Sequence, residues 1–111
     1  MLDSTRIAAI RQELQQIGCA SATSPAFQNQ LLSYLDMNAD RGDFLIEVGC
    51  FRGGMTAQLA YYAAERGKRF YVVDISDEYL ETARNSVKTA LGKVPACVEF
   101  VKKDLATFLR G

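Results

Sequence analysis

The sequence contains no histidine and no tryptophan, and it has no excess of charge of either sign. Without histidine the chain cannot supply a Ser-His-Asp or Cys-His catalytic pair, a zinc site that needs imidazole, or a histidine general base. Its 13 basic and 13 acidic side chains cancel to a formal net charge of zero. This balance argues against nucleic-acid binding by bulk electrostatic attraction and against a polybasic membrane anchor, so neither nucleic acid nor a membrane is an expected partner.

Cysteines are few and apolar runs are short. Cys19, Cys50 and Cys97 are odd in number and include no C-x-x-C pair. A disulfide framework or a four-thiolate metal site is therefore not expected. The first residues carry no apolar signal core, and no apolar run has transmembrane length. These features predict a cytoplasmic protein with reduced, mostly buried thiols.

The length and composition predict one small globular domain, because 49% of the 111 residues are hydrophobic and 23% are charged. Apolar residues at three- and four-residue spacing predict two helices, over residues 4–17 and 26–36. The residues expected to face inward are Ile7, Ile10, Leu14 and Ile17 in the first helix and Phe27, Leu31, Leu32 and Leu35 in the second.

From residue 44 onward, short apolar runs alternate with helical segments. Strands are predicted over 44–48, 69–73 and 98–101, and helices over 55–66 and 77–91. The first run stops abruptly at Gly49 and has the pattern of a strand buried on both faces. Strands that alternate with helices pair in parallel through right-handed crossovers. The predicted class is therefore α/β, with a parallel sheet preceded by two helices.

Polar clusters follow the three predicted strands. Residues 47–54 (Glu-Val-Gly-Cys-Phe-Arg-Gly-Gly) follow the first, Asp74 ends the second, and Asp104 lies beyond the third. In an open parallel sheet, ligands bind at the carboxyl ends of the strands. Gly49 and Gly53 let the backbone turn tightly and approach a ligand closely. Asp74, about twenty residues beyond the glycine loop, is placed to accept both hydroxyls of a ribose, and Asp104 is placed to reach the edge of a base.

The glycine loop narrows the choice of nucleoside. A dinucleotide fold needs G-x-G-x-x-G, but Phe51 occupies the position of the second glycine, and no Gly-Lys-Ser/Thr follows for a P-loop. Glu47, two residues before the first glycine, would repel a phosphate and suits an amine. The expected ligand therefore carries a cation at the end opposite its base, as S-adenosylmethionine does.

The pattern Glu47-x-Gly49-x-x-x-Gly53 resembles motif I of the class I S-adenosylmethionine-dependent methyltransferases. Asp74 and Asp104 match the acids by the ribose and the adenine in that family. The run 46–56 is most similar to small-molecule O-methyltransferases of the catechol and macrocin types, although Met55 stands where many catechol-type members carry a small polar residue. The resemblance implies a Rossmann-like three-layer fold, with strand order 3-2-1 in this chain and 3-2-1-4-5-7-6 in a complete domain.

The resemblance also implies a cofactor site. Glu47 would bind the ammonium group, Asp74 the ribose hydroxyls and Asp104 the adenine side. The full set of predicted cofactor-binding residues is Glu47, Gly49, Cys50, Gly53, Asp74, Ile75, Asp104 and Leu105. The acceptor pocket, the catalytic residues and the metal ligands are expected beyond residue 111. A divalent cation, as in catechol-type members, would belong to the intact protein, and no metal ligand is assigned in this chain.

The chain stops where the family fold would continue toward its fourth strand. The domain is therefore expected to be truncated, with residues 1–38 as a helical lead-in and 43–111 as the cofactor-binding β-α-β-α-β half. Without a fourth strand, the apolar strand 44–48 becomes an unpaired edge, and such edges pair with other chains or aggregate. We expect the rest of a larger protein to cover this edge, with a homodimer as the alternative.

These features favour a methyltransferase that transfers a methyl group from S-adenosylmethionine to a small-molecule hydroxyl, with this chain inactive alone. Two alternatives stay open. One is a non-catalytic S-adenosylmethionine-binding or protein-interaction module that docks through the strand 44–48. The other is a nucleotide-dependent oxidoreductase, which Phe51 and Glu47 disfavour.

Overall fold

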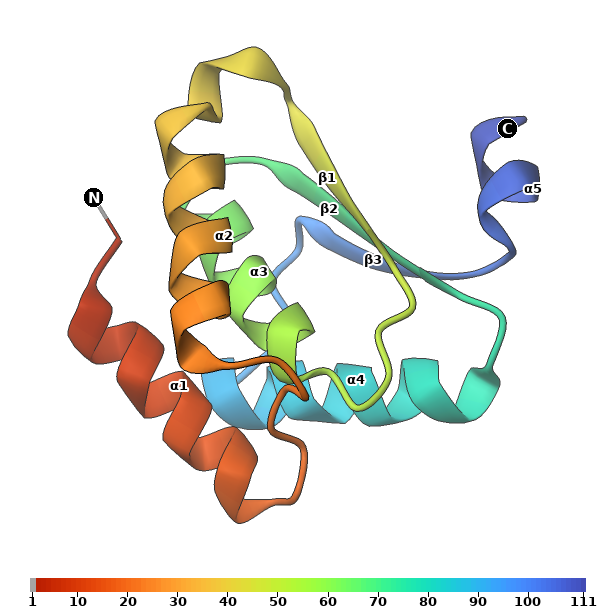
Figure 1. The fold of residues 1–111 in the computed structure, drawn as a ribbon. Coiled ribbons are helices and arrows are strands. Elements are labelled where there is room, and N and C mark those ends of the chain that lie inside the picture. Colours follow the sequence, from red (N-terminus) through yellow and green to blue (C-terminus); the bar gives the residue numbers. More distant parts are fainter. Residues whose placement is uncertain (1) are drawn as a thin grey trace.

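The computed structural model describes residues 2–111, which fold into helices around one three-stranded sheet (Figure 1). The elements are α1 (Ser4–Gln16), α2 (Pro25–Met37), the 3-10 helix η1 (Ala39–Arg41), β1 (Phe44–Val48), α3 (Gly54–Arg66), β2 (Arg69–Asp74), α4 (Asp77–Leu91), β3 (Val98–Lys102) and α5 (Leu105–Leu109). The predicted helices and strands are all present, with ends that differ by at most one residue. None of the helices in this described range combines the length and the hydropathy that a membrane span requires.

Capping residues explain why the helix boundaries were predictable. Asp3 caps α1 by accepting the N–H of Thr5 at 2.9 Å, and the Ser76 hydroxyl caps α4 in the same way. A side-chain cap of this kind stabilises a helix by about 1 kcal/mol. Helices α3 and α4 end at Gly67 and Gly92, both with positive φ, which glycine adopts without steric cost.

The three strands pair in parallel in the order β1-β2-β3, as predicted, so β2 is the central strand. Leu45, Phe70 and Val98 lie side by side in the register, and their side chains therefore point to the same face. That face packs against α3 and α4, and Phe70 and Val72 on it are fully buried. Burying one such side chain contributes about 1.5–3 kcal/mol, so this layer is the core that holds the strand ends in place.

The helices cover the two faces of the sheet unequally. Figure 1 shows α1, α2, α3 and α4 on one side and only the short α5 on the other. On that second face, Phe108 of α5 packs against Tyr71, with ring centroids 5.5 Å apart. Phe44 and Val48 of β1 stay 54% and 52% exposed. The prediction that β1 is buried on both faces is therefore wrong for the described residues, whereas its outer edge is unpaired as predicted.

Two helical residues predicted to face inward are also about half exposed. Ile17 caps the end of α1 and lies beyond its last turn, so it no longer follows the buried stripe of that helix. Phe27 points outward because α2 buries the stripe that contains Gln28 and Leu32. The buried Gln28 side chain is satisfied there, since it accepts a hydrogen bond from Gln58 of α3 at 2.9 Å. The buried face of α2 thus includes a polar contact that apolar periodicity does not reveal.

Candidate functional site

The loop between β1 and α3 has an unusual backbone. Gly49, Phe51 and Gly53 all have positive φ, at 82°, 49° and 88°. A Cβ atom added to Gly49 would meet no atom within 4 Å, so this part of the loop is open to a ligand. A Cβ on Gly53 would lie 2.7 Å from the Cα of Ala83, so this part packs directly on α4. The two predicted loop glycines therefore serve different purposes, one access and the other packing.

Glu47 lies near the end of β1 and points toward α3. Its carboxylate accepts a hydrogen bond from the hydroxyl of Thr56, which is fully buried. Burial raises the pKa of Glu47 to about 7, the Thr56 hydrogen bond opposes this rise, and the charge of Asp74 adds to it. The carboxyl group is thus poised between its protonated and ionised forms near neutral pH. A cation placed beside it would favour the ionised form.

Asp74 ends β2 and joins that strand to the glycine loop. One carboxylate oxygen accepts the N–H of Cys50 at 3.0 Å, and the other accepts the N–H of Ser76 at 2.9 Å. The side chain is buried, with 9% of the residue exposed. The first oxygen also accepts the Cys50 thiol at 3.6 Å, so the oxygen that binds Ser76 is the one that keeps acceptor capacity for a ribose hydroxyl. In this structure Asp74 also holds the loop in place.

Cys50 is a buried neutral thiol. Burial raises its pKa to about 12, and the charges of Asp74 and Glu47 add to this rise. A thiol must ionise to act as a nucleophile. The environment of Cys50 therefore gives it no nucleophilic role, and both its N–H and its thiol donate to Asp74.

The third predicted acid lies apart from the other two. Asp104 is exposed and caps α5, accepting the N–H of Thr107 at 2.7 Å, and this bond lowers its pKa. The chain just before it is tied to β2, because the N–H of Lys103 donates to the Asp74 carbonyl at 3.1 Å. Ile75 and Leu105, the two apolar members of the predicted site, are exposed, the first just after β2 and the second at the start of α5.

The structure therefore brings Glu47, Gly49, Cys50 and Asp74 together and places Asp104 at the neighbouring strand end. Sequence reasoning missed Thr56, which bonds Glu47. It also missed Tyr79, whose ring packs edge-on against Phe51 with centroids 5.3 Å apart. Both residues lie in the first turn of the helix that follows a predicted loop. Their position in the first helical turn after a predicted loop is the sequence feature that could have identified them.

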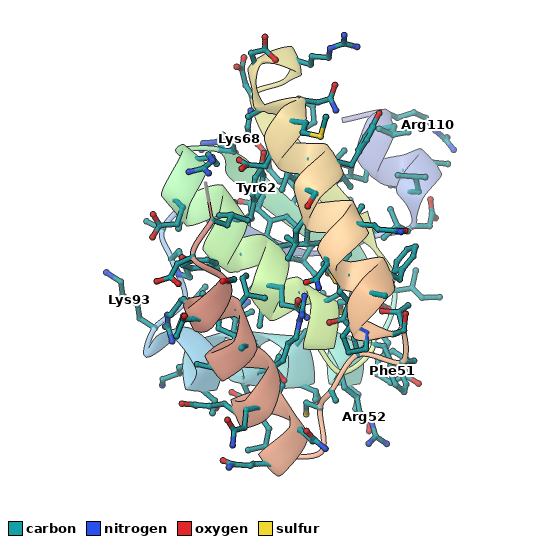
Figure 2. The ribbon with its side chains drawn as sticks, turned by 60° about the vertical axis from the view of Figure 1, so that its left-hand side comes forward. Phe51, Arg52, Tyr62, Lys68, Lys93 and Arg110 are labelled. Atoms are coloured by element: carbon teal, nitrogen blue, oxygen red, sulfur yellow. The ribbon has the colours of Figure 1, made fainter. Side chains whose placement is uncertain are left out.

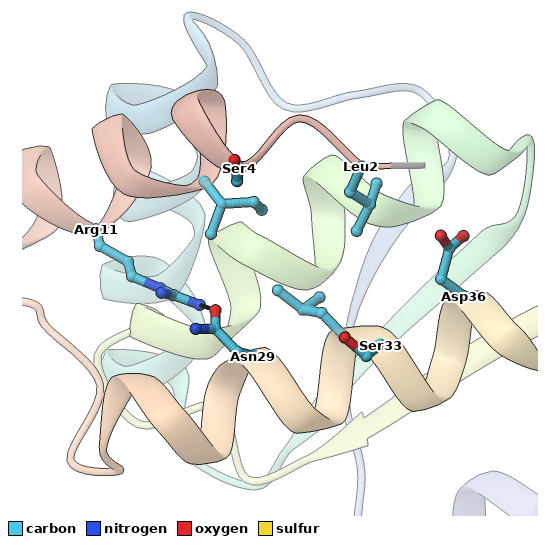
Figure 3. A pocket seen from close by; sticks show the side chains of 8 residues that line it. Leu2, Ser4, Arg11, Asn29, Ser33 and Asp36 are labelled. Atoms are coloured by element: carbon cyan, nitrogen blue, oxygen red, sulfur yellow. Dashed lines mark hydrogen bonds between the residues drawn. The ribbon is translucent and has the colours of Figure 1, made fainter.

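A separate pocket of about 340 Å³ lies between α1 and α2 (Figure 3). Arg11 at one end donates to the Asn29 side chain at 2.7 Å, and Asp36 at the other end is paired with Arg66 at 2.5 Å. Its charged groups are thus already occupied by protein partners. No predicted cofactor residue lines this pocket.

Within residues 2–111, no group of three or more acidic or cysteine side chains is arranged to hold a metal ion. The sequence matches no protein-family model and no curated protein. A solved structure with a similar fold is a "COG1565 superfamily member and likely methyl transferase" from Burkholderia thailandensis, bound to S-adenosyl-homocysteine. The TM-score is 0.57 at 18% identity, and the match covers 90% of this chain and 37% of the neighbour.

The chain has a methyltransferase-like fold. This likeness confirms the predicted α/β, Rossmann-like class with its parallel sheet flanked by helices. At 18% identity the likeness shows the fold alone, and it does not support the predicted catechol or macrocin subtype. The chain spans little more than a third of the neighbour's length.

Proposed function

We propose that this chain is the cofactor-binding half of an S-adenosylmethionine-dependent methyltransferase that acts in the cytoplasm. The observation that carries the proposal is the junction at the ends of β1 and β2. There the buried Asp74 carboxylate binds the N–H of Cys50, beside the Glu47 carboxyl and the open loop at Gly49. A methyltransferase-like neighbour bound to S-adenosyl-homocysteine supports this choice of ligand.

Each predicted residue then has a physical role. Glu47 pairs with the ammonium group, and the backbone at Gly49 approaches the ligand because no Cβ intervenes. Asp74 accepts a ribose hydroxyl through the carboxylate oxygen that binds Ser76, and Asp104 lies on the adenine side. The exposed apolar side chains of Ile75 and Leu105 offer surface to the base.

When bound, S-adenosylmethionine supplies a methyl group on its sulfonium. The chain's own residues bind and orient the ligand, and for in-line displacement such alignment is a large part of catalysis. No histidine is needed for this task. We propose a small-molecule hydroxyl as the acceptor, bound by polypeptide outside residues 2–111. A divalent cation would also bind there, since the described residues offer no cluster for it.

We further propose that polypeptide from the rest of a larger protein covers the outer edge of β1, where Phe44 and Val48 are half exposed. Long apolar edges rarely stay free in native proteins. The same edge favours a second candidate function, a protein-interaction module that docks through β1. Binding of S-adenosyl-homocysteine distinguishes the two functions, because only the methyltransferase requires the ligand site.

Calorimetric titration of the chain with S-adenosyl-homocysteine and with NAD tests the proposal. We expect the first ligand to bind and the second not to bind. Asp74→Ala should weaken the affinity for S-adenosyl-homocysteine at least tenfold, since a charge-assisted hydrogen bond contributes about 1.5–3 kcal/mol. Asp40→Ala, which removes an exposed acid from η1, is the matched control and should bind as the wild type does. Binding of NAD without S-adenosyl-homocysteine would instead support the oxidoreductase.

A further inference from the structure

The glycine loop is held in place by a residue that lies outside the motif. We infer that Ser86, in the middle of α4, is a positioning residue that sets the direction of the Arg52–Gly53 peptide in the ligand-binding loop. The inference rests on the proposed function, because the loop is taken to bind S-adenosylmethionine. It adds a residue that neither the motif nor the likeness to a solved structure assigns.

Ser86 makes a direct and buried contact with the loop. Its side chain is fully buried, and its hydroxyl donates to the carbonyl of Arg52 at 2.7 Å across 34 positions of sequence. The Cβ atom of Ser86 would also lie 3.1 Å from a Cβ added to Gly53. The loop therefore rests on α4 without a gap at this point, and the serine is the polar group at the contact.

The peptide that Ser86 binds is one that could otherwise rotate. Arg52 lies between Phe51 and Gly53, both with positive φ. When a peptide plane flips, its carbonyl and N–H exchange directions with little movement of the neighbouring chain. The Ser86 hydroxyl holds the carbonyl toward α4, and the N–H of Gly53 donates to the Cys50 carbonyl at 2.9 Å. The plane is thus fixed at both ends.

A flipped plane would disrupt the loop beside the open position at Gly49. It would turn the Arg52 carbonyl away from Ser86 and toward the Cys50 carbonyl, and it would break the Gly53–Cys50 bond. Phe51 in the same loop has a positive φ, which costs about 1–3 kcal/mol outside glycine, so the bonds of the loop must also offset this strain. Ser86 therefore favours the binding conformation before the ligand arrives, which is preorganisation.

The start of α3 has separate supports, so the fold should survive the loss of this bond. Gln58 donates to the Gly54 carbonyl at 3.0 Å. A Cβ on Gly54 would lie 2.2 Å from the backbone nitrogen of Ser21, which shows that the linker after α1 also presses on this turn. Ser86→Ala thus removes one hydroxyl from a position that is otherwise well packed.

The test compares Ser86→Ala with Tyr62→Phe. The Tyr62 hydroxyl donates to the Leu35 carbonyl at 2.9 Å, so it is also a side-chain bond to a backbone carbonyl of another element. Figure 2 shows Tyr62 in the upper half of the view, away from Phe51 and Arg52 in the lower half. Both variants should lower the urea midpoint, but only Ser86→Ala should weaken S-adenosyl-homocysteine binding. We expect a Kd about 3- to 10-fold higher, from the net value of one hydrogen bond.

Hydrogen exchange gives a readout that does not need the ligand. In Ser86→Ala the amides of Cys50 and Gly53 should exchange faster, and by a larger factor than those of central α4, which open only with the whole fold. If the wild-type chain binds no S-adenosyl-homocysteine, the proposed function fails, and loop exchange alone decides the role of Ser86. In a chain that binds the ligand, an unchanged Kd in Ser86→Ala overturns the inference. In a chain that does not bind it, unchanged loop exchange does so.

Discussion

Ligand binding at the end of β1 should depend on pH near neutrality, because burial raises the pKa of Glu47 to about 7. The proposed ammonium partner needs the ionised carboxylate. With this pKa, about 3% of the free chains carry the ionised group at pH 5.5 and about half carry it at pH 7. The affinity for S-adenosyl-homocysteine should therefore rise about 15-fold over this range, while the ligand's ammonium group stays protonated.

The same pKa predicts a change in stability that needs no ligand. The folded chain holds the Glu47 proton more tightly than the unfolded chain, whose pKa is near 4.5. The stabilisation is therefore complete below about pH 4.5 and is lost as the pH rises through 7. The whole difference is worth about 3 kcal/mol. Glu47→Gln should lose this part of the pH dependence and gain stability relative to the wild type at pH 8.

Calorimetry in two buffers with different ionisation enthalpies measures the proton release directly. We expect about one proton released per ligand bound at pH 5.5 and about half a proton at pH 7. Glu47→Gln should bind more weakly and without proton release. Thr56→Val removes the hydrogen bond that lowers the Glu47 pKa, so its binding profile should move to higher pH. Equal wild-type affinity at both pH values would refute the reasoning.

Three further predictions concern stability and association. Gly53→Ala should lower the free energy of unfolding in urea by several kcal/mol, since its Cβ would meet the α4 backbone at 2.7 Å. Gly49→Ala, in open space, should lower it by only about 1 kcal/mol through backbone strain. Equal losses of stability in the two variants would contradict the packing of Gly53. The Arg66 hydrogen bond lowers the pKa of Asp36, so this pair should stabilise the chain above about pH 4 and lose its effect as the pH falls. In Asp36→Asn the free energy of unfolding, measured by urea titration at several pH values, should depend less on pH in the acidic range. Val48→Lys should suppress any self-association through the β1 edge in sedimentation velocity, and unchanged association would place the contact elsewhere.

The fold was largely predictable because its signals are local. Asp3 and Ser76 mark helix starts, and Gly67 and Gly92 mark helix ends, so the predicted limits differ little from those observed. The parallel order follows from the alternation of strands and helices. Exposure was less predictable, because whether Phe27 faces the core depends on which neighbours α2 meets.

The candidate site was predictable only in part. The spacing of Glu47, Gly49 and Asp74 places them at adjacent strand ends, and the structure joins Asp74 to the loop between them. Spacing does not show that Asp104 caps α5. Nor does it show that Ser86 reaches Arg52, since that contact forms only when α4 packs beside the loop. Long-range hydrogen bonds of this kind leave no periodic trace in a sequence.

The close approach of Gly54 to Ser21 links the stability of the N-terminal helices to the loop. The linker that contains Ser21 joins α1 to α2, and α1 itself packs on α3 and α4. Opening of α1 would pull this linker away and leave the first turn of α3 without its neighbour. Proteins open in cooperative units defined by such contacts. A ligand that tightens the loop should therefore slow hydrogen exchange in α1, a helix that need not touch the ligand.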